Sequence, residues 1–318
     1  MLILDEQQTA AALPWTPLID ALEAMFKGRG VMPVRHHHDV EVPGQPNATL
    51  LLMPAWLPGR YVGVKLVSVY PGNGSRGLPA VQGSYLLTSG STGEMLAVVD
   101  GGELTARRTA AASALAARSL ARPDAETMMM VGTGRLSLNL MQAHAAVRPL
   151  KSFLIWGRSP DKVRQTVEAA RALGLAAEPS ADLETGIRQA DIISCATLSE
   201  EPLVHGEWLK PGSHVDLVGA FKPSMRESDD EAVRHAEVYV DTKAGALAEA
   251  GDIVQALRSG ALKPDDIRGD LFDLTTGRIA GRSGDTAITL FKSVGAAIED
   301  LAGAILAYET VSGRSGPA

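Results

Sequence analysis

The alternation of apolar and polar residues in the first third of the chain predicts an antiparallel sheet. Residues 61–70 are rich in β-branched and aromatic side chains, and a short apolar run at 50–53 is ended by Pro54. Residues 84–88 and 95–100 flank a Ser-Gly-Ser-Thr-Gly turn. Two such runs joined by a glycine-containing turn are typical of a β-hairpin.

Apolar residues spaced by three and four positions predict three helices outside the central part of the chain. The first covers residues 16–27 and the last covers residues 289–308. The second is alanine-rich and covers residues 104–121, with Thr105 as its N-cap and Pro123 just beyond its end. We expect the last helix to pack on the first third of the chain.

From residue 127 onward, short apolar runs alternate with helical segments. The expected strands are 128–131, 153–156, 192–197, 214–220 and 238–241, and the clearest helices between them cover 136–146 and 161–173. Strands that alternate with helices predict a parallel sheet covered by helices on both faces. The fold class is therefore α/β, with a doubly wound parallel sheet beside a mixed α+β region.

Composition and charge narrow the function classes. The 318 residues are 45% hydrophobic and 21% charged, as in an ordinary globular protein, and the net charge is −7. An acidic chain without a basic block predicts no nucleic-acid partner. The N-terminal residues lack the pattern of a signal peptide, and no apolar run reaches the length of a membrane span, which predicts a cytoplasmic protein without a membrane partner.

A glycine-rich turn after the strand at 128–131 indicates a dinucleotide site. Glycines in a strand–turn–helix context allow a tight turn and a close approach of the backbone to a pyrophosphate at the helix N-terminus. Ser137 stands where the pattern has its third glycine or alanine, and ordinary strand-to-helix turns show the same spacing. The residues expected to form the cofactor loop are Gly132, Thr133, Gly134, Arg135 and Leu136.

The end of the next strand bears on the choice of cofactor. Sites that prefer NAD place an acidic residue there, to accept a hydrogen bond from the ribose 2′-hydroxyl. Here Arg158 and Ser159 follow the strand, and both can donate to a 2′-phosphate. We therefore expect NADP(H) to be preferred, with NAD(H) also possible. The alternative is that Arg158 is only a solvated surface residue and the site is unselective.

Three cations in apolar or small-residue surroundings are candidates for an anion site. Arg35 follows Met-Pro-Val, Lys65 lies inside the apolar strand at 61–70, and Arg108 lies in the first turn expected for the alanine-rich helix. A buried lysine needs an anionic partner, and an arginine near a helix N-terminus can clamp a carboxylate. Spacing alone equally allows three exposed surface residues.

No metal site is expected. In the internal triple His36-His37-His38, only the first and third side chains share a face of a strand, and no nearby carboxylate completes a ligand set. Cys195, the single cysteine, excludes an intrachain disulfide and a thiolate zinc cluster. It has no evident base beside it and is expected to be a small residue near the cofactor; His144 is expected in the core.

Seven stretches together resemble the ornithine cyclodeaminase/μ-crystallin family. They are distributed from the first third of the chain to the last helix, so the resemblance covers nearly the whole chain. The matching stretches are LLMPAW (51–56), GVKLVSVYPGN (63–73), GLPAVQG (77–83), ELTARRTAAASALAA (103–117), VGTG (131–134), VDLVGAFKPSMRESDDE (215–231) and LFKSVGAAIEDL (290–301).

The resemblance implies a domain arrangement, a homodimer and a set of site residues. A substrate-binding and dimerisation domain would comprise 1–120 and 289–318, and a dinucleotide-binding Rossmann domain 121–288. The family's substrate-carboxylate and catalytic cations match Arg35, Lys65 and Arg108, of which the last two are the catalytic candidates. Thr197, Val218, Gly219 and Ser293 would lie along the cofactor, and Val294 near the substrate.

Two departures from the family pattern bear on the reaction. Cyclodeaminases carry an acidic residue where this chain has Leu51, and an aspartate where it has Phe221. The resemblance therefore favours the ketimine-reductase side of the family, which reduces Δ1-pyrroline-2-carboxylate, and also Δ1-piperideine-2-carboxylate, to L-proline and L-pipecolate with NAD(P)H. An ornithine cyclodeaminase, an alanine-type amino acid dehydrogenase and a non-catalytic NADPH-binding protein remain alternatives.

Overall fold

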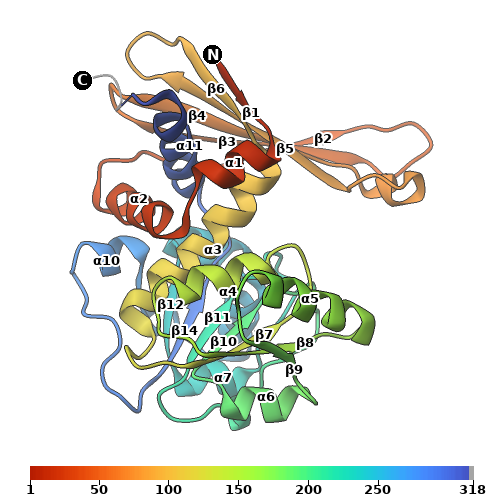
Figure 1. Ribbon diagram of the computed structural model, residues 1–318, viewed down its shortest axis with the longest axis vertical. Coiled ribbons are helices and arrows are strands. Elements are labelled where there is room, and N and C mark those ends of the chain that lie inside the picture. Colours follow the sequence, from red (N-terminus) through yellow and green to blue (C-terminus); the bar gives the residue numbers. More distant parts are fainter. Residues whose placement is uncertain (315–318) are drawn as a thin grey trace. The chain divides into compact units, whose positions relative to one another are not determined.

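The computed structural model describes residues 1–314, which form two compact units. One unit contains residues 1–108 together with the chain from Ala296 onward, and the other contains residues 109–295. Each unit has its own sheet (Figure 1). The two units are described separately below.

The first unit is built on a six-stranded sheet in the order β1-β6-β5-β4-β3-β2. Neighbouring strands are antiparallel except for β1 and β6, which are parallel. The predicted hairpin is confirmed as β5 and β6, and the predicted strand at 61–70 as β4. The strands are β1 (Leu2–Leu4), β2 (His36–Val40), β3 (Ala48–Leu57), β4 (Tyr61–Val69), β5 (Val81–Ser89) and β6 (Met95–Asp100).

Strand β3 continues through Pro54, where the sequence pattern predicted its end. Proline lacks the N–H that a central strand donates to its neighbours. The pairing of β3 with β2 stops at Leu52, which lies opposite His36, the first residue of β2. At Pro54 strand β3 is therefore paired along its length only with β4, where Val64 is its register partner. The prediction of a strand end was wrong because one side of β3 is nearly free of partners there.

The helices of the first unit include α11, the last helix of the chain. It packs on α2 and on the face formed by β3, β4 and β5 (Figure 1). Tyr61, Gly63 and Lys65 alternate along β4 and are buried on the sheet. The helical elements are α1 (Glu6–Ala12), α2 (Trp15–Lys27), η1 (Pro71–Arg76), the first part of α3 (Gly101–Leu120) and α11 (Ala297–Ser312).

Helix α3 begins one turn earlier than predicted. Asp100 is the residue that accepts a hydrogen bond from the first turn, from the backbone N–H of Glu103 at 2.7 Å. Thr105 is not the N-cap, because its hydroxyl lies inside the helix and donates to the carbonyl of Gly101 at 2.6 Å. Arg108 consequently lies beyond the first turn, so the expected contribution of the helix dipole to this residue is lost.

The second unit contains eight parallel strands in the order β13-β12-β14-β11-β10-β7-β8-β9. Together with the covering helices, this confirms the predicted fold class (Figure 1). The strands are β7 (Thr127–Val131), β8 (Ser152–Trp156), β9 (Ala177–Pro179), β10 (Ile192–Cys195), β11 (His214–Leu217), β12 (Ala236–Val240), β13 (Ile267–Asp270) and β14 (Ile288–Lys292).

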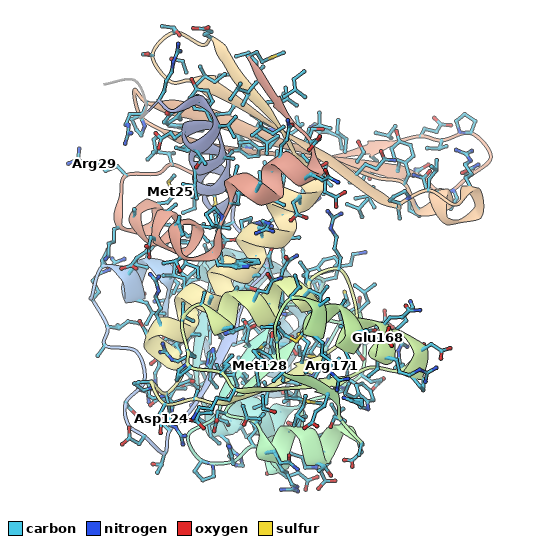
Figure 2. The ribbon with its side chains drawn as sticks, in the orientation of Figure 1. Met25, Arg29, Asp124, Met128, Glu168 and Arg171 are labelled. Carbon is cyan, nitrogen blue, oxygen red and sulfur yellow. The ribbon has the colours of Figure 1, made fainter. Side chains whose placement is uncertain are left out.

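The helices of this unit are short and amphipathic. Helix α5 shows the pattern, with Val163 and Val167 buried and Glu168 and Arg171 exposed; Figure 2 labels the two exposed residues. The helical elements are the rest of α3, α4 (Ser137–Ala145), α5 (Pro160–Ala172), α6 (Leu183–Gln189), η2 (Gly206–Trp208), α7 (Asp230–His235), α8 (Lys243–Glu249), α9 (Gly251–Ser259), η3 (Pro264–Asp266) and α10 (Leu271–Thr275).

The predicted helix over 289–308 is wrong in its first part. Residues Ile288–Lys292 form β14, which lies between β11 and β12 in the middle of the parallel sheet. Its β-branched and aromatic residues suit a strand that is buried on both faces. One boundary between the compact units lies at Gly295, whereas the predicted domain boundary is at residue 288. The other boundary lies within α3 at Arg108, whereas the predicted one is at residue 120.

Candidate functional site

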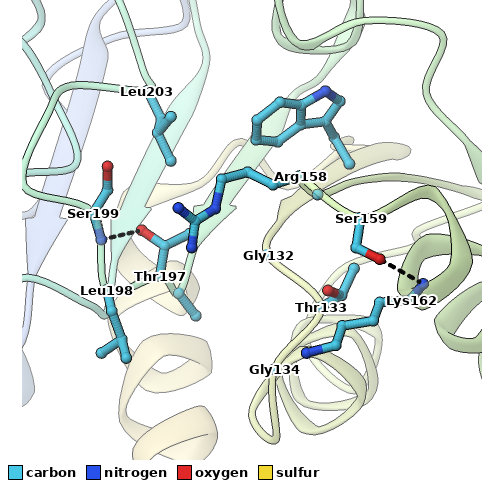
Figure 3. Close-up of a pocket in the computed structure, with 13 residues that line it drawn as sticks. Gly132, Thr133, Gly134, Arg158, Ser159, Lys162, Thr197, Leu198, Ser199 and Leu203 are labelled. Carbon is cyan, nitrogen blue, oxygen red and sulfur yellow. Dashed lines mark hydrogen bonds between the residues drawn. The ribbon is translucent and has the colours of Figure 1, made fainter.

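The first candidate site lies where the strand order of the parallel sheet reverses. From β7, the chain proceeds through β8 and β9 on one side and through β10 and β11 on the other. Ligands of doubly wound sheets bind beyond the carboxyl ends of the strands at this position. A pocket of about 350 Å³ lies here, lined by the loops that follow β7, β8 and β10 (Figure 3).

The glycine turn after β7 has the geometry that a dinucleotide needs. Gly132 has φ +118°, and a Cβ atom there would lie 2.7 Å from the carbonyl oxygen of Ala196, so only glycine fits. Gly134 is exposed, and a Cβ atom there would meet nothing within 4 Å, which leaves its backbone open to a ligand. Ser137, the departure from the pattern, donates its hydroxyl to the carbonyl of Gly132 at 3.0 Å and so stabilises the turn.

The pocket brings together six of the predicted cofactor residues. Arg135 is exposed and Leu136 is half-buried, and neither lines this pocket. The predicted residues that line it are Gly132, Thr133, Gly134, Arg158, Ser159 and Thr197. Lys162, which the sequence places in the first turn of the helix after Arg158 and Ser159, also lines it, and so do Leu198, Ser199 and Leu203, which prediction from the sequence missed.

Arg158, Ser159 and Lys162 form the wall of the pocket that follows β8 (Figure 3). The hydroxyl of Ser159 caps α5 by accepting a hydrogen bond from the backbone N–H of Lys162 at 3.4 Å. Arg158 and Lys162 are exposed and carry positive charge at the edge of the pocket, and Asp161 nearby pairs with Arg164. This wall can therefore receive an anionic group.

Val218, Gly219 and Ser293 follow β11 and β14 at the same edge of the sheet. The backbone N–H of Val218 donates to the carbonyl of Cys195 at 2.8 Å, and that of Ser293 donates to the carbonyl of Leu217 at 3.1 Å. The Ser293 hydroxyl is buried and has no hydrogen-bond partner among residues 1–314. An unpartnered buried hydroxyl fits a ligand group that completes its hydrogen bonding.

The second candidate site lies in the first unit, between β4 and α11. Lys65 is 3% exposed, and its ammonium lies 3.0 Å from Oδ1 and 2.8 Å from Oδ2 of Asp300. Burial lowers the pKa of Lys65 to about 8, against the opposing effect of Asp300 and with a further lowering by Arg108 and Arg35. Both other predicted cations thus act electrostatically on this ammonium, Arg108 more strongly than Arg35.

Two acidic residues that sequence analysis missed hold the arginine of this site. Arg108 is 5% exposed; its Nε lies 2.9 Å from Oδ1 of Asp300, and its NH1 lies 2.6 Å from Oε2 of Glu299. Asp300 therefore bridges Lys65 and Arg108. Lys65 and Arg108 are thus paired with two buried carboxylates, and Arg35 adds a further positive charge that acts on Lys65.

Gly63 leaves room for the ring of Tyr85 on this face of the sheet. Tyr85 is the register partner of Lys65, and its ring fills the space above Gly63, where a Cβ atom would lie 2.1 Å from the Tyr85 hydroxyl. Burial, with the neighbouring Asp300, raises the pKa of Tyr85 well above its usual value. The tyrosine is therefore a neutral neighbour and leaves the charge of the cluster unchanged.

The remaining sequence candidates lie outside both sites. His36, His37 and His38 are exposed on β2, and within residues 1–314 no group of three or more His, Cys, Asp or Glu side chains could hold a metal ion. Cys195 is buried, and burial raises the pKa of its thiol well above the usual value, so it remains a neutral thiol. His144 is buried and lies 3.2 Å from Asp216, as expected for a core residue.

The model of the ornithine cyclodeaminase/mu-crystallin family matches residues 5–315. This chain belongs to that family. The predicted resemblance is thereby confirmed. Within the part of the chain that the structure describes, no helix is long and apolar enough to cross a membrane.

Known members of the family show what this chain is similar to. A Delta(1)-pyrroline-2-carboxylate reductase of Paracoccus denitrificans is 37% identical over 283 residues, which cover 89% of each chain. The structure of the Thermococcus litoralis Delta(1)-pyrroline-2-carboxylate reductase in complex with NADH and L-proline matches with a TM-score of 0.91, at 33% identity and over 100% of both chains. An archaeal alanine dehydrogenase dimer with bound NAD matches with a TM-score of 0.88, at 29% identity, over 100% of this chain and 99% of that one.

Proposed function

We propose that this family member is an NAD(P)H-dependent ketimine reductase. Its substrate would be a cyclic imino acid, Δ1-pyrroline-2-carboxylate and also Δ1-piperideine-2-carboxylate, and its products L-proline and L-pipecolate. The observation that carries the proposal is the buried cluster of Lys65, Arg108 and Asp300, with Arg35 close enough to act on the same ammonium. The gathering of these charged groups around Lys65 supports a substrate that carries a carboxylate. The similarity to two pyrroline-2-carboxylate reductases supports the same reaction.

The residues of the cluster have separate roles in this proposal. Arg108 and Arg35 hold the substrate carboxylate, because guanidinium groups pair well with carboxylates. Lys65 orients the carboxylate and the imine nitrogen, and its ammonium can give a proton to that nitrogen. When bound, the nicotinamide supplies the hydride that reduces the imine carbon. The protein has mainly to position an already electrophilic carbon and to exclude water.

The absence of two carboxylates argues against ornithine cyclodeamination. Leu51 and Phe221 stand where the cyclodeaminases carry acidic residues, and Phe221 is 44% exposed on the loop after β11. Val294, which belongs to the predicted substrate set, is half-buried, and its backbone N–H donates to Oδ2 of Asp241 at 2.7 Å. Apolar side chains at these places suit a ring better than a second free amine.

The pocket of the second unit fits a dinucleotide, and we propose NADP(H) as the preferred form. Gly132 and Gly134 provide the turn and the open backbone, and the end of β8 offers Arg158 in place of an acidic residue. An arginine can pair with a 2′-phosphate, whereas an acidic residue would repel it. Two similar structures hold NADH or NAD, which supports NAD(H) as a second possibility.

A homodimer is part of the same proposal. The family resemblance implies it, and the similar alanine dehydrogenase is a dimer. Alanine dehydrogenation is also the second candidate reaction, because that enzyme matches the chain over its whole length.

An assay with a panel of substrates tests the proposed function. NADPH and NADH oxidation would be followed with the five- and six-membered cyclic imines and with pyruvate plus ammonia, and ammonia release would be followed with ornithine. We expect rapid oxidation with the imines only. Ammonia release from ornithine would establish a cyclodeaminase instead, and binding of NADPH without turnover of any substrate would establish a binding protein.

A further inference from the structure

A buried group of charges lies inside the second unit, apart from the residues predicted from the sequence. Glu227, Asp252 and Lys292 are each fully buried. The ammonium of Lys292 lies 3.2 Å from Oδ2 of Asp252 and 3.9 Å from Oε2 of Glu227. Burying charges costs more free energy than their pairing returns unless hydrogen bonds complete the network. We therefore expect these buried charges to have a role that apolar side chains could not perform.

Glu227 holds the loop that follows β10. Its Oε1 accepts hydrogen bonds from the backbone N–H of Thr197 at 2.6 Å and from the Thr197 hydroxyl at 2.8 Å. That hydroxyl in turn accepts a hydrogen bond from the backbone N–H of Ser199 at 3.3 Å, drawn in Figure 3. Both donors of Thr197 are thus directed to one buried carboxylate, although Thr197 lines the pocket.

Lys292 holds the loop that follows β11. Its ammonium donates to the carbonyl oxygen of Gly219. A Cβ atom at Gly219 would lie 2.1 Å from the carbonyl oxygen of Thr197 and 2.4 Å from Oε1 of Glu227, so the two loops touch over the carboxylate. Asp252 completes the network, because its Oδ1 accepts from the backbone N–H of Glu227 at 2.8 Å.

We propose that Glu227 is a positioning residue for the dinucleotide groove, holding the loops after β10 and β11 at the spacing that accepts the cofactor. Glu227 acts directly on the loop after β10 through its hydrogen bonds with Thr197. It acts indirectly on the loop after β11, because Lys292, which lies beside it, donates to Gly219. This inference rests on the proposed use of the pocket as the cofactor site. Burial raises the pKa of Glu227 above its usual value, with Lys292 opposing the rise. The amide oxygen of a glutamine could still accept from Thr197 and so replace part of the function of Glu227.

The experiment measures NADH and NADPH affinity by the fluorescence of the reduced nicotinamide in the full-length protein. Glu227→Ala removes the acceptor of both Thr197 donors, and we expect the dissociation constants to rise about tenfold. Glu227→Gln keeps an acceptor oxygen, and we expect a rise of about two- to threefold. At saturating cofactor, the Michaelis constant for the imine should stay unchanged in both variants, because the anion cluster is untouched.

Asp216→Asn provides the matched control. Asp216 is also fully buried in the second unit and accepts hydrogen bonds from side chains, including the Ser194 hydroxyl at 2.6 Å, but it does not line the pocket. We expect this variant to lower the melting temperature and to leave cofactor affinity unchanged. If Asp216→Asn and Glu227→Ala both lost cofactor affinity in proportion to their loss of melting temperature, the effect would be a general structural one. That result would overturn the inference.

The outcomes separate this inference from the proposed function. If the wild-type protein binds neither NADH nor NADPH, the use of the pocket is wrong and the inference falls with it. If the wild type binds cofactor and a folded Glu227→Ala binds it equally well, only the positioning role is wrong. Should Glu227→Ala not fold, Glu227→Gln and Thr197→Val decide the question, and unchanged affinity in both would refute the role.

Discussion

Lys65 and Lys292 are two buried lysines with opposite surroundings. Lys65 shares its carboxylate partner Asp300 with Arg108, and the positive charges of Arg108 and Arg35 both act on its ammonium. Lys292 is the cation between Glu227 and Asp252, so the group around it carries an excess negative charge when both carboxyls are ionised.

The difference separates a binding site from a structural network. A cluster in which further positive charges act on the ammonium is stabilised when an anion enters, whereas a network whose ammonium already donates to a backbone carbonyl needs no ligand. A buried lysine is therefore informative only together with the charges and acceptors around it. The predictions below test this distinction, from the largest expected effect to the smallest.

Replacing the lysine of the positive cluster should cause the largest loss of activity. We expect Lys65→Ala to lower kcat/KM for the cyclic imine about a thousandfold, because a positioned charge at the reacting group is lost. Cofactor affinity should persist, since Lys65 belongs to the first unit and the pocket to the second. Lys27→Ala, which removes an exposed lysine paired only with Glu23 in the described contacts, is the control. Normal turnover in Lys65→Ala would refute the assigned role.

Removing the shared carboxylate should change the pH dependence of the same reaction. The pKa of Lys65 is lowered to about 8, and the protonated form binds the carboxylate, so kcat/KM should fall as the pH rises through this value. Asp300 opposes the lowering, so in Asp300→Asn the pKa of Lys65 should fall further and the decline should begin at lower pH. A loss of about tenfold at the pH optimum would accompany the shift.

The control for this prediction is Asp300→Glu, which keeps the charge and should partly restore the wild-type profile. An unchanged basic limb in Asp300→Asn would show that Lys65 is not the titrating group.

A smaller and selective effect is expected at the edge of the cofactor pocket. Arg158→Ala should raise the Michaelis constant for NADPH about tenfold and that for NADH by less than about twofold, because only NADPH has a 2′-phosphate to pair with the guanidinium. Arg164→Ala, which removes an exposed arginine paired with Asp161, should change neither constant. Equal changes for both cofactors in Arg158→Ala would contradict the assignment.

The smallest expected effect concerns the loop held by Lys292. Ala220 has φ +47°, a left-handed conformation that an alanine adopts only with strain. We expect Ala220→Gly to raise the free energy of unfolding by about 0.5 kcal/mol, the released strain exceeding the entropy cost of glycine. Urea denaturation measures this change. A destabilised variant would mean that the surrounding network imposes no strain on this residue.

Much of the fold could be predicted from local pattern, and the exceptions have specific causes. Strand β14 was mistaken for the start of a helix because its short apolar run is continuous with the helical pattern of α11. The end of β3 was misplaced at Pro54 because the pattern does not show that the pairing of β3 with β2 stops at Leu52. Thr105 was taken as a cap because the residue that performs this role, Asp100, ends the preceding strand.

The candidate site could be predicted only in part. The gathering of Arg35, Lys65 and Arg108 was expected from the family resemblance, and their roles stay predictions. Asp300 and Glu227 were missed because acidic residues are exposed in most proteins, and no local pattern marks those that are buried. Their partners lie far away in the sequence, so only the folded chain reveals them.

The placement of β14 and α11 has a consequence for how the chain folds as it is synthesised. Until residues 288–312 have been synthesised, the parallel sheet lacks β14 from its middle and the first sheet lacks the helix α11 that covers one of its faces. Nascent chains that stop short of Lys292 would expose two open apolar surfaces at once, the condition in which chaperones are recruited and aggregation begins. The completion of both cores thus depends on one stretch of chain, residues 288–312.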